Sequence, residues 1–126
     1  MKLGYTILYV SDVRASLRFY EQAFGLSTKF VHDGGDFGEL DTGNTSLAFC
    51  SLSLLRAMGK TPGQPSVERP VSEVALVTDD VPAAFAHAVS AGAHALQAPE
   101  LMPWGQTVAY VADPDGFWVE LCTPVS

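Results

Sequence analysis

The stretch GYTILYVSDVRASLRFYEQAFG, residues 4–25, holds a strand signal followed directly by a helix signal. Its first seven residues are rich in β-branched and aromatic side chains, which favour strands. Ser11-Asp12 then offers an N-cap, and the apolar side chains of Val13–Phe24 recur at spacings that share one helical face. Gly25 is placed to end that helix. The stretch predicts a strand over Gly4–Val10 and an amphipathic helix after it.

The same pattern occurs a second time. A strand is predicted over Glu73–Val77 and a helix over Val81–Ala91. Asp80, the N-cap candidate of this second helix, lies 68 residues after Asp12, its counterpart in the first. The chain therefore repeats itself.

Three short strand-like runs follow each predicted helix, separated by turn residues such as Gly, Asn and Pro. They are Ser27–His32, Phe37–Asp41 and Ser46–Ser51 in the first half, and Ala93–Ala98, Thr107–Val111 and Phe117–Thr123 in the second. Each half reads as a βαβββ module, over 1–51 and 72–126. The Gly- and Pro-containing segment 52–71 is expected to be a mobile connector.

A half of this length cannot bury both faces of a four-stranded sheet, so we expect the two modules to fold together. The predicted fold class is α+β, with two βαβββ modules forming a curved mixed sheet around a central cleft. With 126 residues, the whole of 1–126 is expected to be one domain.

Composition excludes several classes of protein. The chain has 48% hydrophobic residues and a formal charge of −7, and its seven basic residues are scattered singly, so nucleic acid is not an expected partner. No run of about 18 apolar residues and no signal-peptide pattern occurs, so we expect a soluble cytoplasmic protein with no membrane partner. The acidic excess favours cationic ligands, although solubility is its commoner role.

The repeat also selects candidate site residues. Tyr5 is equivalent to Glu73 on the first strands, and Ala48 is equivalent to Glu120 on the last strands. Side chains alternate along a strand, so each of these shares a face with the residues two positions away. The residues predicted to line the cleft are Tyr5, Ile7, Tyr9, Ala48, Cys50, Glu73, Trp118, Glu120 and Cys122.

Glu73 and Glu120 interrupt apolar strands, where an unpaired carboxylate is costly. If the two are close, mutual repulsion raises at least one pKa and suits it to general acid or base catalysis. A cationic ligand relieves the same repulsion. In a third interpretation, hydrogen bonds from Tyr5 or the backbone satisfy one carboxylate, which then only shapes the pocket.

Tyr5, Tyr9, Trp118 and the loop residue Trp104 are candidate aromatic walls for a planar or cationic small molecule, and core packing is the alternative role. Cys50 and Cys122 are too few for a disulfide framework, and inert buried thiols are favoured over nucleophiles.

The three histidines suit surface or helix-packing roles better than a site. His87 and His94 lie in or just after the second helix, whereas His32 precedes a Gly-Gly turn, from which it could reach the cleft mouth.

The sequence resembles the vicinal oxygen chelate superfamily in several features. These are the paired modules, Asp12 with the helix residues Ser16, Phe19-Tyr20 and Phe24-Gly25-Leu26, and above all the run 113–121 (DPDGFWVEL). This group contains glyoxalases, bleomycin resistance proteins and extradiol dioxygenases. The resemblance implies the fold but not one activity, since relatives include metal-dependent enzymes and metal-free drug-binding proteins.

In the family's metal enzymes, His or Glu ligands come from the first and last strand of each module. Those positions are Tyr5, Ala48, Glu73 and Glu120 here, without histidine. No cofactor is therefore expected; the alternative is a divalent metal (Mn, Mg, Fe, Zn or Ni) held by Glu73 and Glu120.

The missing histidine ligands and the acidic balance favour a metal-independent protein, similar to bleomycin resistance proteins, that binds a small cationic or aromatic molecule in the cleft between modules. The resemblance also implies a homodimer. The alternative is a lyase, isomerase or dioxygenase that uses an oxygen-rich metal site or a Glu73/Glu120 acid–base pair.

Overall fold

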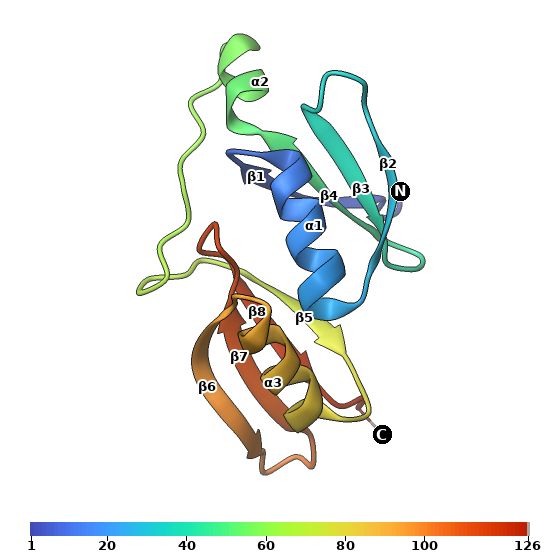
Figure 1. Cartoon of the computed structure of the whole chain (residues 1–126), viewed down its shortest axis with the longest axis vertical. Coiled ribbons are helices and arrows are strands. Elements are labelled where there is room, and N and C mark those ends of the chain that lie inside the picture. Colours follow the sequence, from blue (N-terminus) through green and yellow to red (C-terminus); the bar gives the residue numbers. More distant parts are fainter. Residues whose placement is uncertain (126) are drawn as a thin grey trace. The chain divides into compact units, whose positions relative to one another are not determined.

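The computed structural model describes residues 1–125, and the chain divides into two compact units (Figure 1). The first unit is Met1–Gln64, and the second unit begins at Pro65. Each unit holds one four-stranded mixed sheet. The fold is α+β and consists of two modules, as the repeat predicts.

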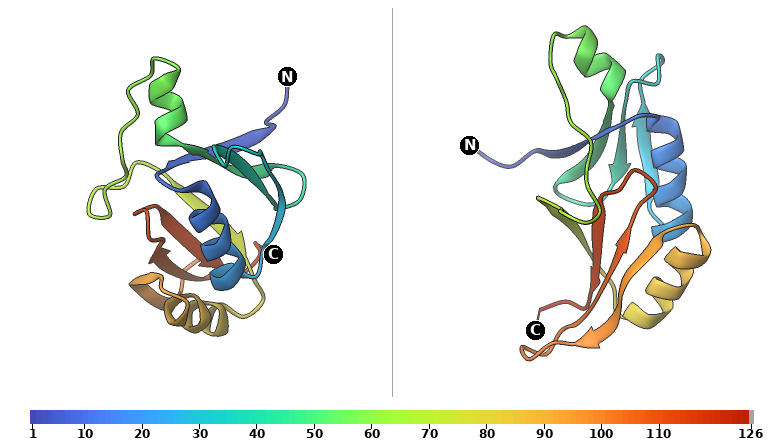
Figure 2. Two further views of the ribbon diagram at one scale, coloured as in Figure 1. Left: turned by 45° about the horizontal axis from the view of Figure 1, so that its top comes forward. Right: turned by 90° about the vertical axis from the view of Figure 1, so that its left-hand side faces the viewer.

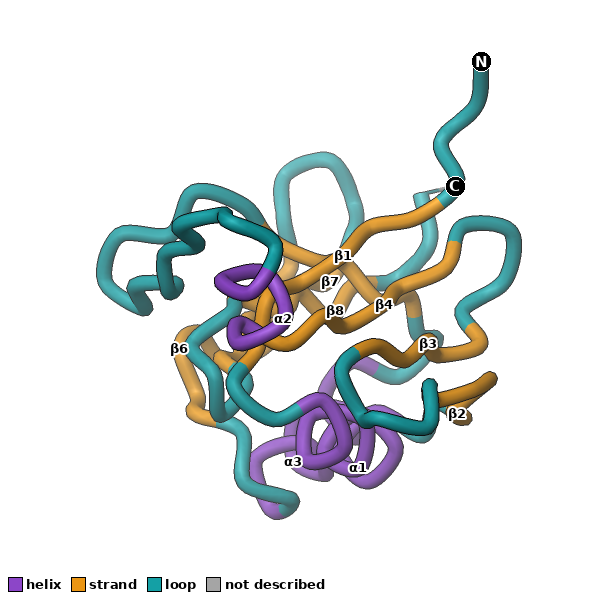
Figure 3. Tube along the Cα trace, turned by 90° about the horizontal axis from the view of Figure 1, so that it is seen from above, coloured by secondary structure: helices purple, strands orange, loops and turns teal. Residues whose placement is uncertain are grey.

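The first unit contains β1 (Tyr5–Val10), α1 (Val13–Phe24), β2 (Ser27–Val31), β3 (Phe37–Asp41), β4 (Ser46–Ser51) and α2 (Leu52–Ala57). Its strands are ordered β1-β4-β3-β2, with β1 and β4 parallel and the other pairs antiparallel. α1 packs on β2, β3 and β4, and the short α2 follows β4 directly (Figure 3).

The second unit contains β5 (Glu73–Val77), α3 (Val81–Ser90), β6 (His94–Leu101), β7 (Thr107–Ala112) and β8 (Trp118–Cys122). Its order, β5-β8-β7-β6, is the same topology again, with β5 and β8 parallel. α3 packs on β6, β7 and β8 and covers one face of this sheet (Figure 2).

Sequence signals explain why both helices start where they do. The Asp12 and Asp80 carboxylates accept the backbone N–H groups of Ala15 and Ala83, each at 3.1 Å. These are the N-caps that the repeat predicts, and they satisfy donors that the first turn of a helix leaves unbonded.

A close approach between α1 and β3 requires glycine at position 38. A Cβ there would lie 2.8 Å from the Leu17 side chain and 3.3 Å from that of Val13. Residues with the parity of Gly38 therefore face α1, whereas Phe37, Glu39 and their neighbours in register lie on the opposite face. We call that opposite face of each sheet its helix-free face.

The Asp-Pro-Asp-Gly run forms the turn between β7 and β8. Asp113 is 1% exposed, and its Oδ1 accepts the N–H groups of Asp115, Gly116 and Phe117, each at 2.9 Å. Gly116 takes a positive φ of 102°, a conformation that favours glycine. The motif most specific to the resemblance thus builds a turn and sets the start of β8.

The structure differs from the sequence prediction in two places. β6 runs on to Leu101 through two register irregularities. The predicted mobile connector is partly ordered, because the Ser51 side chain caps α2 within it and the Trp118 indole N–H donates to the Val67 carbonyl at 2.7 Å. A helix therefore replaces the expected loop at the start of the segment, whereas its end remains a loop that the bond from Trp118 ties to β8. No helix within residues 1–125 is long and apolar enough to cross a membrane.

Candidate functional site

The helix-free face of the second unit gathers the predicted site residues of that half. Val119 and Leu121 alternate with Trp118, Glu120 and Cys122 along β8, and both are buried in the core. Trp118, Glu120 and Cys122 therefore share the helix-free face with their register partners on β5, which are Glu73, Ala75 and Val77.

Tyr110 joins this set from β7. It pairs with Glu120 in register, and its hydroxyl donates a hydrogen bond of 2.9 Å to Glu120 Oε1. Its ring centroid lies 5.3 Å from that of Trp118. We call Glu73, Tyr110, Trp118 and Glu120 the carboxylate cluster.

The electrostatics of the carboxylate cluster disfavour further negative charge. Loss of water around the Glu73 carboxyl raises its pKa, and the neighbouring Glu120 charge adds to the rise, although a hydrogen bond from Tyr110 opposes it. Burial, helped by the bond to Glu120, raises the pKa of Tyr110 to about 12. The phenol therefore stays protonated at neutral pH and serves as a donor.

The thiol of Cys122 behaves in the same way. Burial and then the Glu120 carboxylate raise its pKa to about 11, and its Sγ lies 3.9 Å from the Leu76 carbonyl oxygen. A thiol in this environment is a poor nucleophile at neutral pH.

The two tryptophans of the second unit differ in their surroundings. Trp118 is partly buried, and its bond to Val67 holds its ring beside Tyr110. Trp104 is 66% exposed in the loop after β6, where its N–H donates to Gln106 Oε1 at 2.7 Å. Trp104 therefore lies on a loop, as Pro103 and Gly105 predict, whereas Trp118 belongs to the carboxylate cluster.

The remaining candidates lie on the helix-free face of the first unit. Tyr5, Ile7 and Tyr9 of β1 are all exposed, alternating with the buried Leu8 and Val10 from Ile7 onward. Ala48 and Cys50 of β4, beside β1, are buried.

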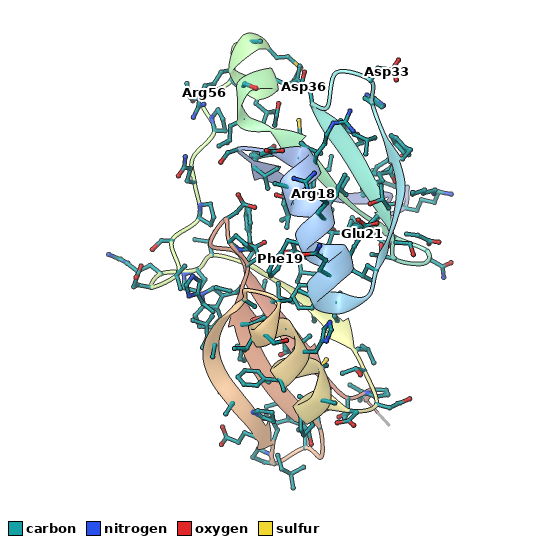
Figure 4. All side chains as sticks on the ribbon, viewed as in Figure 1. Arg18, Phe19, Glu21, Asp33, Asp36 and Arg56 are labelled. Atoms are coloured by element: carbon teal, nitrogen blue, oxygen red, sulfur yellow. The ribbon has the colours of Figure 1, made fainter. Side chains whose placement is uncertain are left out.

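Burial and the nearby Asp36 carboxylate raise the pKa of the Cys50 thiol. Asp36 itself lies near the start of α2 (Figure 4), where it accepts the Ser51 hydroxyl at 2.8 Å.

The histidines are divided between the units. His87 lies in α3 and His94 begins β6, as predicted, whereas His32 directly follows β2 and stacks on Phe30.

The net charge of the protein is confined to the second unit. Positions 1–64 carry six acidic and six basic residues, whereas 65–126 carry eight acidic residues and one basic residue, Arg69. The carboxylate cluster therefore lies in the acidic half of the chain, a surrounding that attracts cations.

The donor set does not fit a transition-metal centre of the kind that the family's metal enzymes hold. Two carboxylates, a protonated phenol and a protonated thiol offer no imidazole or thiolate. Within the described part of the chain, no group of three or more His, Cys, Asp or Glu side chains is placed to hold a metal ion.

Comparison with known proteins identifies the family. The family model for the glyoxalase/bleomycin resistance protein/dioxygenase superfamily matches residues 2–121. This chain belongs to that superfamily.

The similarity to individual proteins extends over nearly the whole chain. The uncharacterized protein YwbC of Bacillus subtilis (strain 168) is 28% identical over 122 residues, which are 94% of each chain. A glyoxalase-related enzyme from Fulvimarina pelagi superposes with a TM-score of 0.83 at 24% identity and covers 98% of this chain and 88% of its own. A protein of unknown function from Agrobacterium tumefaciens str. C58 gives 0.80 at 28%, over 98% and 94%.

Tyr110 is the cluster residue that sequence reasoning missed. The candidate positions come from the first and last strand of each module, whereas Tyr110 lies on the third strand of its module. The signal was present, because aligning β7 on β3 at an offset of 71 residues places Tyr110 on Glu39, and each is a polar residue between two apolar neighbours.

Proposed function

We propose that this protein binds a small organic cation through the carboxylate cluster, without a metal. The observation that carries the proposal is that Glu73 and Glu120 lie on the same face of the paired strands β5 and β8, offset by two positions in register. Burial and then the charge of Glu120 raise the pKa of Glu73 there. A cation between them relieves this repulsion, as a proton does.

The neighbouring groups favour a planar ligand with N–H donors. Glu120 uses one oxygen to accept the Tyr110 hydroxyl and keeps acceptor capacity for a ligand. The Trp118 ring, fixed by its bond to Val67, offers an aromatic surface beside the carboxylates. Amidinium and guanidinium groups match carboxylates with paired hydrogen bonds and stack on such rings.

Benzamidine is a suitable probe, and benzamide is its uncharged counterpart of nearly the same shape. We expect calorimetry with the full chain to show saturable benzamidine binding that is at least tenfold tighter than benzamide binding. The Glu120→Gln variant keeps an acceptor for Tyr110 but loses the negative charge. It should therefore weaken benzamidine binding about tenfold, which corresponds to about 1.4 kcal/mol.

Glu100→Gln is the matched control, because Glu100 is an exposed carboxylate of β6 in the same unit. It removes the same charge and should leave binding within twofold. Equal affinity for benzamide, unchanged binding by Glu120→Gln, or loss of binding when a chelator is added would each contradict the proposal.

The raised pKa of Glu73 also favours a second candidate function, proton transfer by Glu73 and Glu120 on a bound substrate. Incubation with a metabolite mixture, followed by mass spectrometry, distinguishes the two. Conversion lost in both Glu73→Gln and Glu120→Gln establishes catalysis, whereas recovery of every compound unchanged favours binding alone.

A further inference from the structure

The segment 65–71 precedes β5 and contacts the carboxylate cluster at Trp118. We call this segment the strap. The Trp118 indole N–H donates to the Val67 carbonyl at 2.7 Å. A Cβ on Gly116 would lie 3.4 Å from the Pro65 side chain and 3.5 Å from that of Val67, so both side chains lie against the turn before β8. The first half of the strap is thus fixed to the second unit.

The other end of the strap leads into the same cluster. Glu73, two residues after the strap, begins β5 and pairs in register with Trp118. Fully extended, the six residues from Val67 to Glu73 would span about 20 Å, whereas both ends are held beside Trp118. The chain between them therefore turns back, and Arg69 lies in this turn, where its backbone N–H donates to Ser66 Oγ at 3.3 Å.

Arg69 is the single lysine or arginine among positions 65–126. Its side chain is exposed, and within residues 1–125 no hydrogen bond or ion pair holds its guanidinium group. Because successive Cα atoms are about 3.8 Å apart, the Cα of Arg69 lies within about 8 Å of that of Val67. The long, flexible arginine side chain therefore extends from a backbone position close to Trp118 and Glu73.

Among the described residues, the groups that interact with Glu73 supply no positive charge. They are Glu120 and two groups that stay protonated at neutral pH, Tyr110 and Cys122, whose pKa values are raised to about 12 and about 11. The strap has one carboxylate of its own, Glu68, which accepts the Ser66 hydroxyl at 3.5 Å. Arginine keeps its charge at every pH at which carboxylates are ionised, so Arg69 is the permanent cation of this unit.

We propose that the strap has a second, closed position, in which the guanidinium group of Arg69 donates hydrogen bonds to Glu73 and Glu120. The structure shows the open position, in which Arg69 bonds to neither carboxylate. A planar guanidinium group suits paired carboxylate oxygens, and closing relieves the repulsion between the two charges. The closed strap is an autoinhibitory contact, because Arg69 then occupies the place of a cationic ligand. This competition rests on the function proposed for the cluster, whereas the ion pair does not.

Neither position of the strap is expected to dominate. Ion pairs at exposed positions are weak, because water and salt screen both charges. A ligand binds the open position alone, so its apparent affinity scales with the open fraction. If about one molecule in three is open, removing the guanidinium group tightens ligand binding about threefold.

Exchange of the Arg69 Nε–H proton with water, followed by nitrogen-15 NMR of the full-length protein, tests the ion pair without a ligand. A proton bonded to a carboxylate is protected, so exchange in wild type proceeds from the open position. Glu73→Gln combined with Glu120→Gln should speed exchange about threefold. The control combines Glu68→Gln with Glu100→Gln, which removes two exposed carboxylates from the same unit, and should leave the rate within about 1.5-fold.

A benzamidine titration tests the competition. Arg69→Gln should tighten benzamidine binding about threefold, because the ligand no longer competes with the guanidinium group. Val71→Glu changes the net charge by the same amount at a fully exposed position of the strap and keeps Arg69. It should change binding by no more than about 1.5-fold, since salt screens an exposed charge.

Equal exchange rates in wild type and the Glu73/Glu120 double variant, or an equal increase in the control, overturn the ion pair. Equal tightening by Arg69→Gln and Val71→Glu overturns the competition. If wild type and Arg69→Gln both fail to bind benzamidine, the competition falls together with the function proposed for the cluster. The exchange rates then still decide whether Arg69 closes on the carboxylates, so the two failures are distinguishable.

Discussion

The two units share one backbone plan and differ in the chemistry of one face. Tyr5 pairs with Ser46 in the first unit, as Glu73 pairs with Trp118 in the second. Two residues further along, each unit has a middle row of three residues paired across adjacent strands. The rows Ile7–Ala48–Glu39 and Ala75–Glu120–Tyr110 correspond one to one. The helix-facing residues stay apolar in both. The topology therefore needs only a shared pattern of burial, while the helix-free face differs in chemistry between the halves. Tyr5, Ala48 and Glu39 in the first unit stand where Glu73, Glu120 and Tyr110 stand in the second.

The turns before the last strands provide the largest test of this comparison. Asp113 holds three backbone N–H groups in the second unit, so Asp113→Ala strands all three donors near the core. We expect a loss of about 4 kcal/mol in the free energy of unfolding. Urea denaturation followed by tryptophan fluorescence reports on this unit, since both tryptophans lie in it.

Thr42→Val is the counterpart in the first unit. Thr42 donates to the Thr45 carbonyl at 2.8 Å and accepts the Leu47 N–H at 3.0 Å, so its loss should cost only about 1 kcal/mol. Equal losses in the free energy of unfolding for the two variants would show that the two turns contribute equally to stability, which would contradict the expected difference.

Ala48→Glu places a carboxylate at the first unit's equivalent of Glu120. Ala48 is fully buried and pairs in register with Glu39, so the new charge is both desolvated and close to a like charge. We expect a loss of about 3 kcal/mol, measured by urea denaturation.

A second substitution sharpens the result. Glu39→Tyr in the Ala48→Glu background recreates the Tyr110–Glu120 pair and should recover at least half of the loss. If the double variant is less stable than Ala48→Glu alone, the correspondence between the two middle rows does not extend to their chemistry.

Much of this architecture was predictable from local signals. Asp12 and Asp80 predict both helix starts, and the strand Glu73–Val77 has its predicted bounds, because caps and alternation act over a few residues. The bond from Trp118 to Val67 was not predictable, since it joins residues 51 positions apart. The short helix α2 was not predicted either, because the Gly and Pro residues that follow it favour a loop. Pairing of Glu120 with Tyr110 likewise depends on register across strands, and register is set by the whole sheet.

Tyr110→Phe tests the pairing that gives the second unit its character. Loss of the bond to Glu120 should cost about 1.5 kcal/mol at neutral pH. The folded pKa of about 12 lies above the usual tyrosine pKa of 10.0, so the stability that Tyr110 contributes is present below pH 10 and is lost as the pH rises toward 12. Wild type and variant should therefore converge in stability over that range, which urea denaturation at several pH values measures. A wild type that stays more stable than the variant by the full amount at pH 12 would contradict this.

Glu73→Gln should have the smallest effect and the opposite sign. The folded state raises the pKa of Glu73, so protonation stabilises the folded protein and ionisation at higher pH removes that stabilisation. Because Glu73 is exposed to solvent, we expect the variant to be more stable than wild type by only a few tenths of a kcal/mol at pH 7. The difference should vanish as the pH falls below the pKa of Glu73, where wild type carries the proton. Glu100→Gln removes an equal charge from the same unit without a close carboxylate partner. An equal gain in stability from that control would assign the effect to the net charge of the second unit. The two units would then differ in total acidity, and the pair Glu73 and Glu120 would have no specific effect on stability.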